Sequence, residues 1–436
     1  MRVALIHAER HGGCTLKDVA GGFGTVFSVG SSPLARLLEA GKRHVAALPN
    51  VMIAYLHALF TGEGADVDVV HLSSAADLTP ADLYLVASSI TDCNLEREIM
   101  REARRRFGAR VGVFGTFAAT VPDFYLDAAD FVVTEEIEPL VPALARGDWP
   151  EGVVAGGFVE DLDGLPFPNW DAFDVGRFRY RIITRRGVTL PVLGSRGCAY
   201  RCDYCPYLVN SRFRTRSVAS LVEEIAWLNE RYGARGISFR DPLRLFDLAQ
   251  AEEFGDALRA RGLDVRFSME CRADRLDEPL LDALHRAGLR SLEIGVEAAN
   301  PETVAAHERR PPSIERVERV VRHCHRIGVR VIANFLFGLP NDDEAGMRET
   351  ARYARRLNTF AVQFTVATPY PGTSLHREVE DRIFEKDWER FDGWTNVWRH
   401  PSLGADAIHR LRERAYVAYH FRPAYVWRFL RSTVLA

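Results

Sequence analysis

The stretch GCAYRCDYCPY, residues 197–207, places three cysteines within eight positions, with the spacing Cx3Cx2C. Cys198, Cys202 and Cys205 have no histidine or fourth cysteine near them in the sequence. A structural zinc site needs four tight ligands, and only a distant partner such as Cys271 or Cys324 could complete one here. Three thiolates can instead hold three irons of a [4Fe-4S] cluster and leave the fourth iron open to a small molecule.

Strand-like apolar runs alternate with helical stretches from about residue 186 onward, and the cysteine loop follows the first of these runs. The alternation predicts parallel strands joined by helices, as in a partial (β/α)6 TIM-type barrel over residues 186–380. Chemistry in such barrels lies at the carboxyl ends of the strands, where the loop is expected. The six predicted strands lie within residues 189–197, 236–241, 265–273, 291–298, 329–338 and 361–373.

The first 150 residues also alternate strand and helix patterns, which predicts a Rossmann-like, doubly wound α/β domain over residues 1–150. Ligands of such sheets bind beyond the carboxyl ends of the strands. Ordinary turn chemistry is the alternative explanation for the small and polar residues found there. These residues are Ser88, Ser89, Thr91, Gly115, Thr116, Thr134 and Glu135.

Two further segments differ in composition from the two α/β regions. Residues 151–185 include DLDGLPFPNWDAFD, whose proline, glycine and aspartate content is typical of an interdomain linker. Residues 381–436 are rich in aromatic side chains at helical spacing, which predicts a C-terminal helical region. Aromatics in such a pattern usually pack in the core, although some line substrate pockets.

Composition limits the classes of partner and compartment. A net charge of -3 with 26% charged residues provides no basic field for phosphates, so nucleic acid is not the expected partner. No run approaches the roughly eighteen apolar residues of a membrane helix, and the opening residues do not resemble a signal peptide. Seven cysteines are an odd number, which argues against a disulfide framework. We therefore expect a protein of the reducing cytoplasm, with neither membrane nor nucleic acid as partner.

The cysteine loop also resembles a known signature. Cys198, Cys202 and Cys205, with aromatic Tyr204 before the last cysteine, resemble the CxxxCxΦC motif of the radical S-adenosylmethionine (SAM) superfamily. The resemblance implies that the three thiolates bind a [4Fe-4S] cluster whose open iron is chelated by the amino and carboxylate groups of SAM. An electron from the cluster then cleaves the sulfonium and produces a 5′-deoxyadenosyl radical.

The same resemblance extends to residues at the ends of later strands. It implies that Asp241, Arg272 and Glu297 contact the SAM amine, carboxylate and ribose, respectively. A zwitterionic ligand requires such acceptors and a guanidinium donor, whereas a structural ion pair is the alternative for each residue. Further implied contacts with SAM are Glu270 beside Arg272 and, around the adenosine, Asn334, Gly338, Thr368 and Tyr370.

The N-terminal sheet resembles a cobalamin-binding domain. Ser88-Ser89-Ile90 is similar to the SxL element of that family, and Gly115-Thr116 is similar to its GG element with the second glycine replaced. The stretch FVVTEEIEPL is similar to the GEGE stretch, with Thr134 and Ile137 in place of both glycines. The DxHxxG motif that supplies a lower axial histidine is absent, and His11 is the candidate for a cobalt ligand.

These resemblances imply a cobalamin-dependent radical SAM enzyme similar to the class B methyltransferases. The expected reaction transfers a methyl group to an unactivated carbon of a small-molecule, natural-product substrate, with a flavodoxin or ferredoxin as electron donor. The alternative keeps the cofactors but catalyses a rearrangement, cyclisation or heteroatom exchange. A methylthiotransferase fits less well, because only Cys14 and Cys93 precede the motif. A cobalamin- or zinc-binding sensor module is the non-enzymatic alternative.

Overall fold

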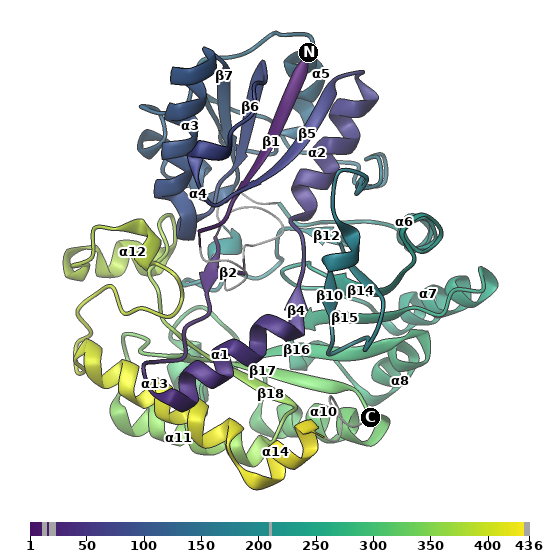
Figure 1. Ribbon diagram of the computed structural model, residues 1–436. Coiled ribbons are helices and arrows are strands. Elements are labelled where there is room, and N and C mark those ends of the chain that lie inside the picture. Colours follow the sequence, from purple (N-terminus) through teal and green to yellow (C-terminus); the bar gives the residue numbers. More distant parts are fainter. Residues whose placement is uncertain (11–14, 17–22, 209–211, 431–436) are drawn as a thin grey trace.

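The structure is a computed structural model that describes residues 1–10, 15–16, 23–208 and 212–430. Two six-stranded sheets dominate it, and each is parallel throughout. In Figure 1 the first sheet lies at the top, and the second lies below it with helices on its outer side. No helix among the described residues is both long and apolar enough to cross a membrane.

The first sheet has the strand order β5-β1-β6-β7-β8-β9. Helices α2 (Val51–Gly62) and α5 (Val141–Ala145) cover one face, and α3 (Cys93–Phe107) and α4 (Thr116–Thr120) cover the other. The predicted doubly wound sheet is thus confirmed. The strands are β1 (Arg2–Ala8), β5 (Asp66–Leu72), β6 (Leu83–Ala87), β7 (Arg110–Phe114), β8 (Phe131–Val133) and β9 (Gly152–Val154).

Strand β9 lies in the stretch that we predicted as a linker. It pairs in parallel with β8, and its Val153 and Val154 are β-branched residues suited to a strand. The first sheet therefore has a sixth strand that periodicity did not reveal, because only three residues form it.

The second sheet has the order β11-β14-β15-β16-β17-β18, and its two edge strands do not pair with each other. This arrangement confirms the predicted partial (β/α)6 barrel. The strands are β11 (Val188–Val192), β14 (Ala234–Phe239), β15 (Arg266–Cys271), β16 (Leu289–Glu297), β17 (Arg330–Phe337) and β18 (Ala361–Val366). The connecting helices are α6 (Val218–Tyr232), α7 (Leu248–Ala260), α8 (Glu278–Ala287), α10 (Ile314–Ile327) and α11 (Glu344–Leu357).

Local sequence determines where these helices begin. Each is preceded by a serine or aspartate whose side chain accepts a hydrogen bond from a backbone N–H of the first turn, which satisfies a donor that the helix leaves unpaired. These capping residues are Ser217, Asp247, Asp277, Ser313 and Asp343.

Segments that do not belong to the barrel pack against both of its edge strands, β11 and β18. Strand β4 (Ala46–Ala47) pairs with β10 (Arg179–Tyr180), which packs beside β11. At the other edge, α13 (Ala405–His420) packs on β18, and α1 (Pro33–Val45) lies against α13 (Figure 1). The first 50 residues therefore contribute to the wall of the barrel as well as to the first sheet.

The C-terminal region is less helical than predicted. Residues 383–404 contain one short 3-10 turn, Trp388–Arg390, and regular helix begins only at Ala405. Pro401 and Gly404 oppose a helix in this stretch. The aromatic side chains still pack as expected, and the buried ones are Phe391, Trp394, Trp398, Tyr416 and Tyr419.

A buried ion-pair network joins the first sheet to the chain on either side of the cysteine loop. Arg196 lies on β12 (Ser195–Arg196) and contacts Glu136 at 3.2 Å and Glu138 at 2.6 Å, both located after β8. Arg214 on β13 (Arg214–Thr215) contacts Glu136 at 2.6 Å. Burial opposes the charge of Arg196, but Glu138 and Glu136 hold its pKa above the usual value. Because Arg196 is two residues before Cys198, this network fixes the base of the cysteine loop.

We expect Glu138→Gln to lower the free energy of unfolding by about 3 kcal/mol, because it leaves the Arg196 charge buried with a weaker partner. Urea denaturation measures the change. The double substitution Glu138→Leu with Arg196→Met should recover most of the loss, since it removes both charges. Equal midpoints for Glu138→Gln and the parent protein would contradict the role of this pair.

Candidate active site

The three cysteines lie on the loop that follows β11 and β12. Gly197 begins this loop with φ +75°, and a Cβ there would lie 2.3 Å from the carbonyl oxygen of Arg212, so a side chain does not fit. None of the three thiols forms a disulfide. Burial raises the pKa of Cys198, and it raises that of Cys205 to about 12, with further contributions from the neighbouring cysteines. Burial therefore opposes ionisation of the Cys198 and Cys205 thiols, and a cation beside them would make their thiolates favourable.

Arg309 supplies positive charge beside the loop. Its Nη1 lies 3.8 Å from Sγ of Cys202, and its Nη2 lies 3.1 Å from Oε1 of Glu297. Nη2 also donates to the carbonyl oxygen of Gly295 at 2.9 Å, whereas the buried Nε has no partner. This guanidinium connects a cluster cysteine to the end of β16.

Glu297 holds an unusual backbone conformation at that end. Its φ is 69°, in the left-handed region that a non-glycine residue adopts only when its surroundings impose it. The pairing of β16 with β17 is irregular between Gly295 and Glu297, which turns the Glu297 side chain toward Arg309. Burial raises the pKa of this carboxyl, while Arg309 and Arg272 oppose the rise.

Arg272 approaches the loop from the end of β15. Its guanidinium stacks 4.2 Å from the ring centre of Tyr200, and its Nε donates to Oδ1 of Asp274 at 2.9 Å. Nη2 donates to the carbonyl oxygen of Arg310. Nη1 is buried without a hydrogen-bond partner. Arg272 is therefore oriented by three contacts and keeps one donor available.

Asp241 follows β14, the strand that pairs with β15. Its carboxylate accepts hydrogen bonds from the Gly194 N–H at 3.2 Å and from the Ser195 hydroxyl, and burial raises its pKa. These contacts fix the chain between β11 and β12. The predicted contact with the SAM amine remains a prediction, since the structure gives this carboxylate a structural role.

Some of the other residues predicted around SAM lie at or beyond the ends of the barrel strands, and others lie within the strands. Tyr204 packs on Leu336, Leu339 and Ala367 at the ends of β17 and β18, with its buried hydroxyl unpaired. Thr368 and Tyr370 follow β18, and the Thr368 hydroxyl donates to the carbonyl oxygen of Val366 at 3.1 Å. Deeper positions hold Glu270, which is 3.6 Å from Arg240, and Asn334, which donates to Glu293 at 3.0 Å.

Some of the residues predicted to bind cobalamin are partly exposed to solvent, and others are buried by neighbouring chain. Gly115 and Thr116 are half-buried after β7, and Gly115 has φ +116°, which side-chain-bearing residues rarely adopt. The Ser88 hydroxyl accepts from the Ala118 N–H at 3.2 Å, and Ser89 and Thr91 hydrogen-bond each other at 2.9 Å. A Cβ on Gly24 would lie 2.5 Å from Oγ1 of Thr91 and 2.6 Å from Oγ of Ser89. The backbone at Gly24 therefore covers these two hydroxyls.

Thr134 and Glu135 form hydrogen bonds with the end of β9 and the residues that follow it. Thr134 donates through N and Oγ1 to the carbonyl oxygen of Val154, and Glu135 accepts from the Gly157 N–H at 2.8 Å. A cobalamin contact by these residues remains a prediction. His11, the candidate cobalt ligand, lies outside the described residues.

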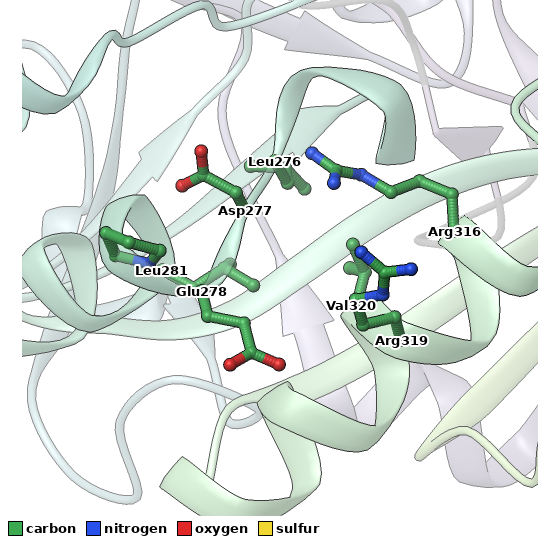
Figure 2. Close-up of a pocket in the computed structure, with 8 residues that line it drawn as sticks. Leu276, Asp277, Glu278, Leu281, Arg316, Arg319 and Val320 are labelled. Carbon is green, nitrogen blue, oxygen red and sulfur yellow. The ribbon is translucent and has the colours of Figure 1, made fainter.

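A separate surface pocket of about 330 Å³ lies between α8 and α10 on the outer side of the barrel. Figure 2 shows Asp277 and Glu278 on its α8 side and Arg316 and Arg319 on its α10 side. The pocket is thus lined by two acidic and two basic side chains on opposite sides.

Residues 192–354 match the family model described as the Radical SAM superfamily. This part of the chain is a radical SAM domain. The match contains the cysteine loop, Arg272, Glu297 and Arg309, and it confirms the family predicted from the CxxxCxΦC motif. SAM and a [4Fe-4S] cluster are the cofactors of this family, and the free thiols, the unpaired Nη1 of Arg272 and the buried Glu297 fit them.

Curated relatives include several methyltransferases. An uncharacterized methyltransferase of Pyrococcus horikoshii is 23% identical over 65% of this chain and 65% of its own length. Bacteriochlorophyllide d C-12(1)-methyltransferase of Chlorobaculum tepidum is 25% identical over 50% of this chain and 49% of its own. The anaerobic magnesium-protoporphyrin IX monomethyl ester cyclase of Rubrivivax gelatinosus is 27% identical over 58% and 44%, respectively. The chain thus spans about half to two thirds of the length of these relatives.

A solved structure covers both sheets. The radical SAM methyltransferase TsrM of Kitasatospora setae, determined with cobalamin and a [4Fe-4S] cluster bound, has a TM-score of 0.62. The similarity covers 95% of this chain and 85% of TsrM at 18% identity. This result supports the predicted pairing of a Rossmann-like domain with a partial barrel.

Sequence reasoning missed Arg309, Glu293 and Gln363. Arg309 belongs to a chain whose basic residues are nearly all arginine, so its residue type carried no signal. Glu293 could have been found, because it alternates with buried apolar residues along β16 and shares a face with Gly295, two residues further on.

We expect Arg309→Met to raise the dissociation constant for SAM about tenfold, because a hydrogen bond to a charged group contributes about 1.5–3 kcal/mol and Glu297 loses its partner. Equilibrium binding to the anaerobically reconstituted protein measures this effect. Arg310→Met is the matched control, since that side chain is exposed and only its carbonyl oxygen contacts Arg272. Equal affinities of the two variants for SAM would contradict the role of Arg309.

Proposed function

We propose that the protein is a cobalamin-dependent radical SAM methyltransferase that acts on an unactivated carbon of a small molecule. One observation carries the proposal. The free thiols of the cysteine loop, Arg272, Glu297 and Arg309 converge at the mouth of a partial barrel that faces a Rossmann-like domain. The methyltransferase names of relatives and the bound cobalamin of TsrM support it.

The residues at the mouth of the barrel would hold the cluster and SAM. When bound, these groups supply reductive cleavage of SAM to a 5′-deoxyadenosyl radical, and cobalamin supplies the methyl group. Cys198, Cys202 and Cys205 would ligate three irons. The free Nη1 of Arg272 is suited to a carboxylate, and Glu297 offers acceptors for hydroxyl groups.

The first sheet would hold cobalamin. Gly115 and Thr116 lie at the carboxyl edge of β7, where ligands of doubly wound sheets bind, and they remain half-buried rather than covered. Phe23 packs against Phe117 at 6.2 Å and Tyr370 at 5.1 Å between ring centres, so the segment at Phe23 and Gly24 bridges the two sheets. This segment would lie between Ser89 and a ligand at the edge of the sheet.

A second candidate function is a radical reaction without methyl transfer. The cyclase of Rubrivivax gelatinosus among the relatives favours it, because that protein shares a similar stretch with this chain. Rearrangement, cyclisation or heteroatom exchange would use the same cluster and SAM site. The mass of the product distinguishes the two functions, since only methylation adds a methyl group.

The proposed chemistry requires particular surroundings. A cluster with an open iron and free thiols requires a reducing compartment, which supports a cytoplasmic location. Reductive cleavage requires a one-electron donor, for which a flavodoxin or ferredoxin is suited. The substrate would be a small molecule, because a barrel mouth that faces a second domain is an enclosed setting for catalysis.

Anaerobic reconstitution with iron, sulfide and hydroxocobalamin tests the proposal. We expect about four irons and about one cobalt per chain after desalting, by the stoichiometry of one cubane and one cobalamin. Addition of a reductant and SAM should release 5′-deoxyadenosine. The triple variant Cys198→Ala, Cys202→Ala, Cys205→Ala should lose the iron and this product but keep cobalt. An intact iron content in the triple variant would contradict the proposal.

Substitution at Gly115 tests the cobalamin site separately. Gly115→Ala places a side chain on a backbone with φ +116°, and such strain costs on the order of 1–3 kcal/mol. We expect cobalt retention to weaken about tenfold while the iron content is unchanged. Gly62→Ala is the control, because a Cβ there meets no atom within 4 Å. Equal cobalt retention in both variants would argue against cobalamin at this edge.

A further inference from the structure

The interior of the barrel carries an unusual set of polar side chains. Glu270 and Glu293 lie opposite each other on β15 and β16, and Asn334 and Gln363 lie opposite each other on β17 and β18. All four are half-buried and alternate with fully buried apolar residues, so they share the inward face of the sheet. Closed barrels usually fill this space with branched apolar residues.

These side chains are connected by hydrogen bonds. Oε1 of Glu293 accepts from Nδ2 of Asn334 at 3.0 Å and from Nε2 of Gln363 at 2.9 Å. Glu270 lies 3.6 Å from Nη1 of Arg240, which follows β14. Burial raises the pKa of the Tyr180 phenol, and the charge of Glu293 contributes to this rise.

The charges in this network do not balance at Glu293. Arg240 provides a positive partner for Glu270, whereas Glu293 receives hydrogen bonds from neutral amides only. Among the described residues, no arginine, lysine or histidine nitrogen lies within 4.0 Å of the Glu293 carboxylate. Oδ1 of Asn334 is buried without a hydrogen-bond donor as well. A half-buried carboxylate beside an unpaired acceptor is complementary to a cation that carries N–H donors.

The position of Glu293 relates this carboxylate to the active site. Glu297 lies four residues further along the same strand, beyond the irregular pairing after Gly295, and its Oε1 lies over Gly295, where a Cβ would be 2.4 Å away. A ligand at Glu293 therefore lies deeper in the barrel than groups held by Glu297 and Arg309. Its remainder can extend toward the mouth, where the cysteine loop lies.

We propose that the barrel interior binds a protonated amine of the substrate, with Glu293 as its counter-ion and Asn334 as a second acceptor. The inference rests on the proposed function and narrows its substrate to molecules that carry an amine. A purely structural network is the alternative. In a purely structural network, Oδ1 of Asn334 would accept a hydrogen bond from a protein donor, and the barrel interior would not bind cations preferentially.

Binding of matched small molecules to the reconstituted holoenzyme tests this proposal. The probes are phenethylamine with 2-phenylethanol and butylamine with 1-butanol, measured by saturation-transfer NMR with and without SAM. We expect each amine to bind at least about tenfold more tightly than its alcohol, because a charge-assisted hydrogen bond replaces a neutral one. Glu293→Gln should abolish this preference and leave the dissociation constant for SAM unchanged. Glu253→Gln, at an exposed position, is the matched control.

A second variant covers the case in which Glu293→Gln does not fold. Gln363→Lys places an ammonium group where Nε2 of Gln363 now contacts Glu293, so it supplies the missing cation from within the chain. It should remove the amine preference while the carboxylate remains in place.

Three results would overturn the proposal. The first is equal binding of amines and alcohols to the parent protein. The second is an amine preference that survives in both Glu293→Gln and Gln363→Lys. The third is weaker SAM binding in Glu293→Gln with an unchanged amine preference, which would assign the carboxylate to SAM. Release of 5′-deoxyadenosine, measured in the same preparation, reports on the proposed function independently, because amine binding requires no turnover.

Discussion

The guanidinium of Arg309 connects the parts of the site that the fold brings together from different strands. It lies beside Cys202, bonds to the carbonyl oxygen of Gly295 and pairs with Glu297. Thiolates and a buried carboxylate repel one another, so this arrangement needs a cation between them. Burial alone would lower the pKa of Arg309, but Glu297 and the groups around Cys202 hold it above its usual value. The left-handed backbone of Glu297 is maintained by the same contact.

The guanidinium of Arg196 also holds separate parts of the chain together, at the base of the cysteine loop. Arg196 pairs with Glu136 and Glu138, which follow β8 of the first sheet. These pairs hold the base of the cysteine loop against the first domain. The loop is thus held from both sides, by the first domain through Arg196 and by the barrel through Arg309. A displacement between the domains would move the thiols relative to Arg272 and Glu297. The contact between domains is therefore part of the geometry of the site.

Periodicity and motif spacing predicted the parts of the structure that depend on local sequence. Apart from β9, the strands of both sheets belong to these parts, as does the cysteine loop, because apolar alternation and the Cx3Cx2C spacing are each readable within about fifteen residues. The contacts of the stretch FVVTEEIEPL could not be predicted from local sequence. Thr134 and Glu135 in this stretch were predicted to contact cobalamin, whereas the pairing of Glu136 and Glu138 with Arg196, which lies about 60 residues further on, was not predicted. Pairings at that separation depend on how the domains meet, and no local pattern encodes this.

Charge is distributed unequally along the axis of the barrel. Arg272 and Arg309 lie at the mouth beside the cysteine loop, whereas Glu270 and Glu293 lie inside, where Arg240 is 3.6 Å from Glu270. In a medium of low dielectric constant, such a separation produces a field that orients a polar ligand as well as attracting it. An amine-bearing molecule would enter with its cationic end inward, and its uncharged end would face the mouth. Selectivity for the reacting carbon would then follow from the length of the ligand, since the inner charge fixes one end and the cofactors lie at the other.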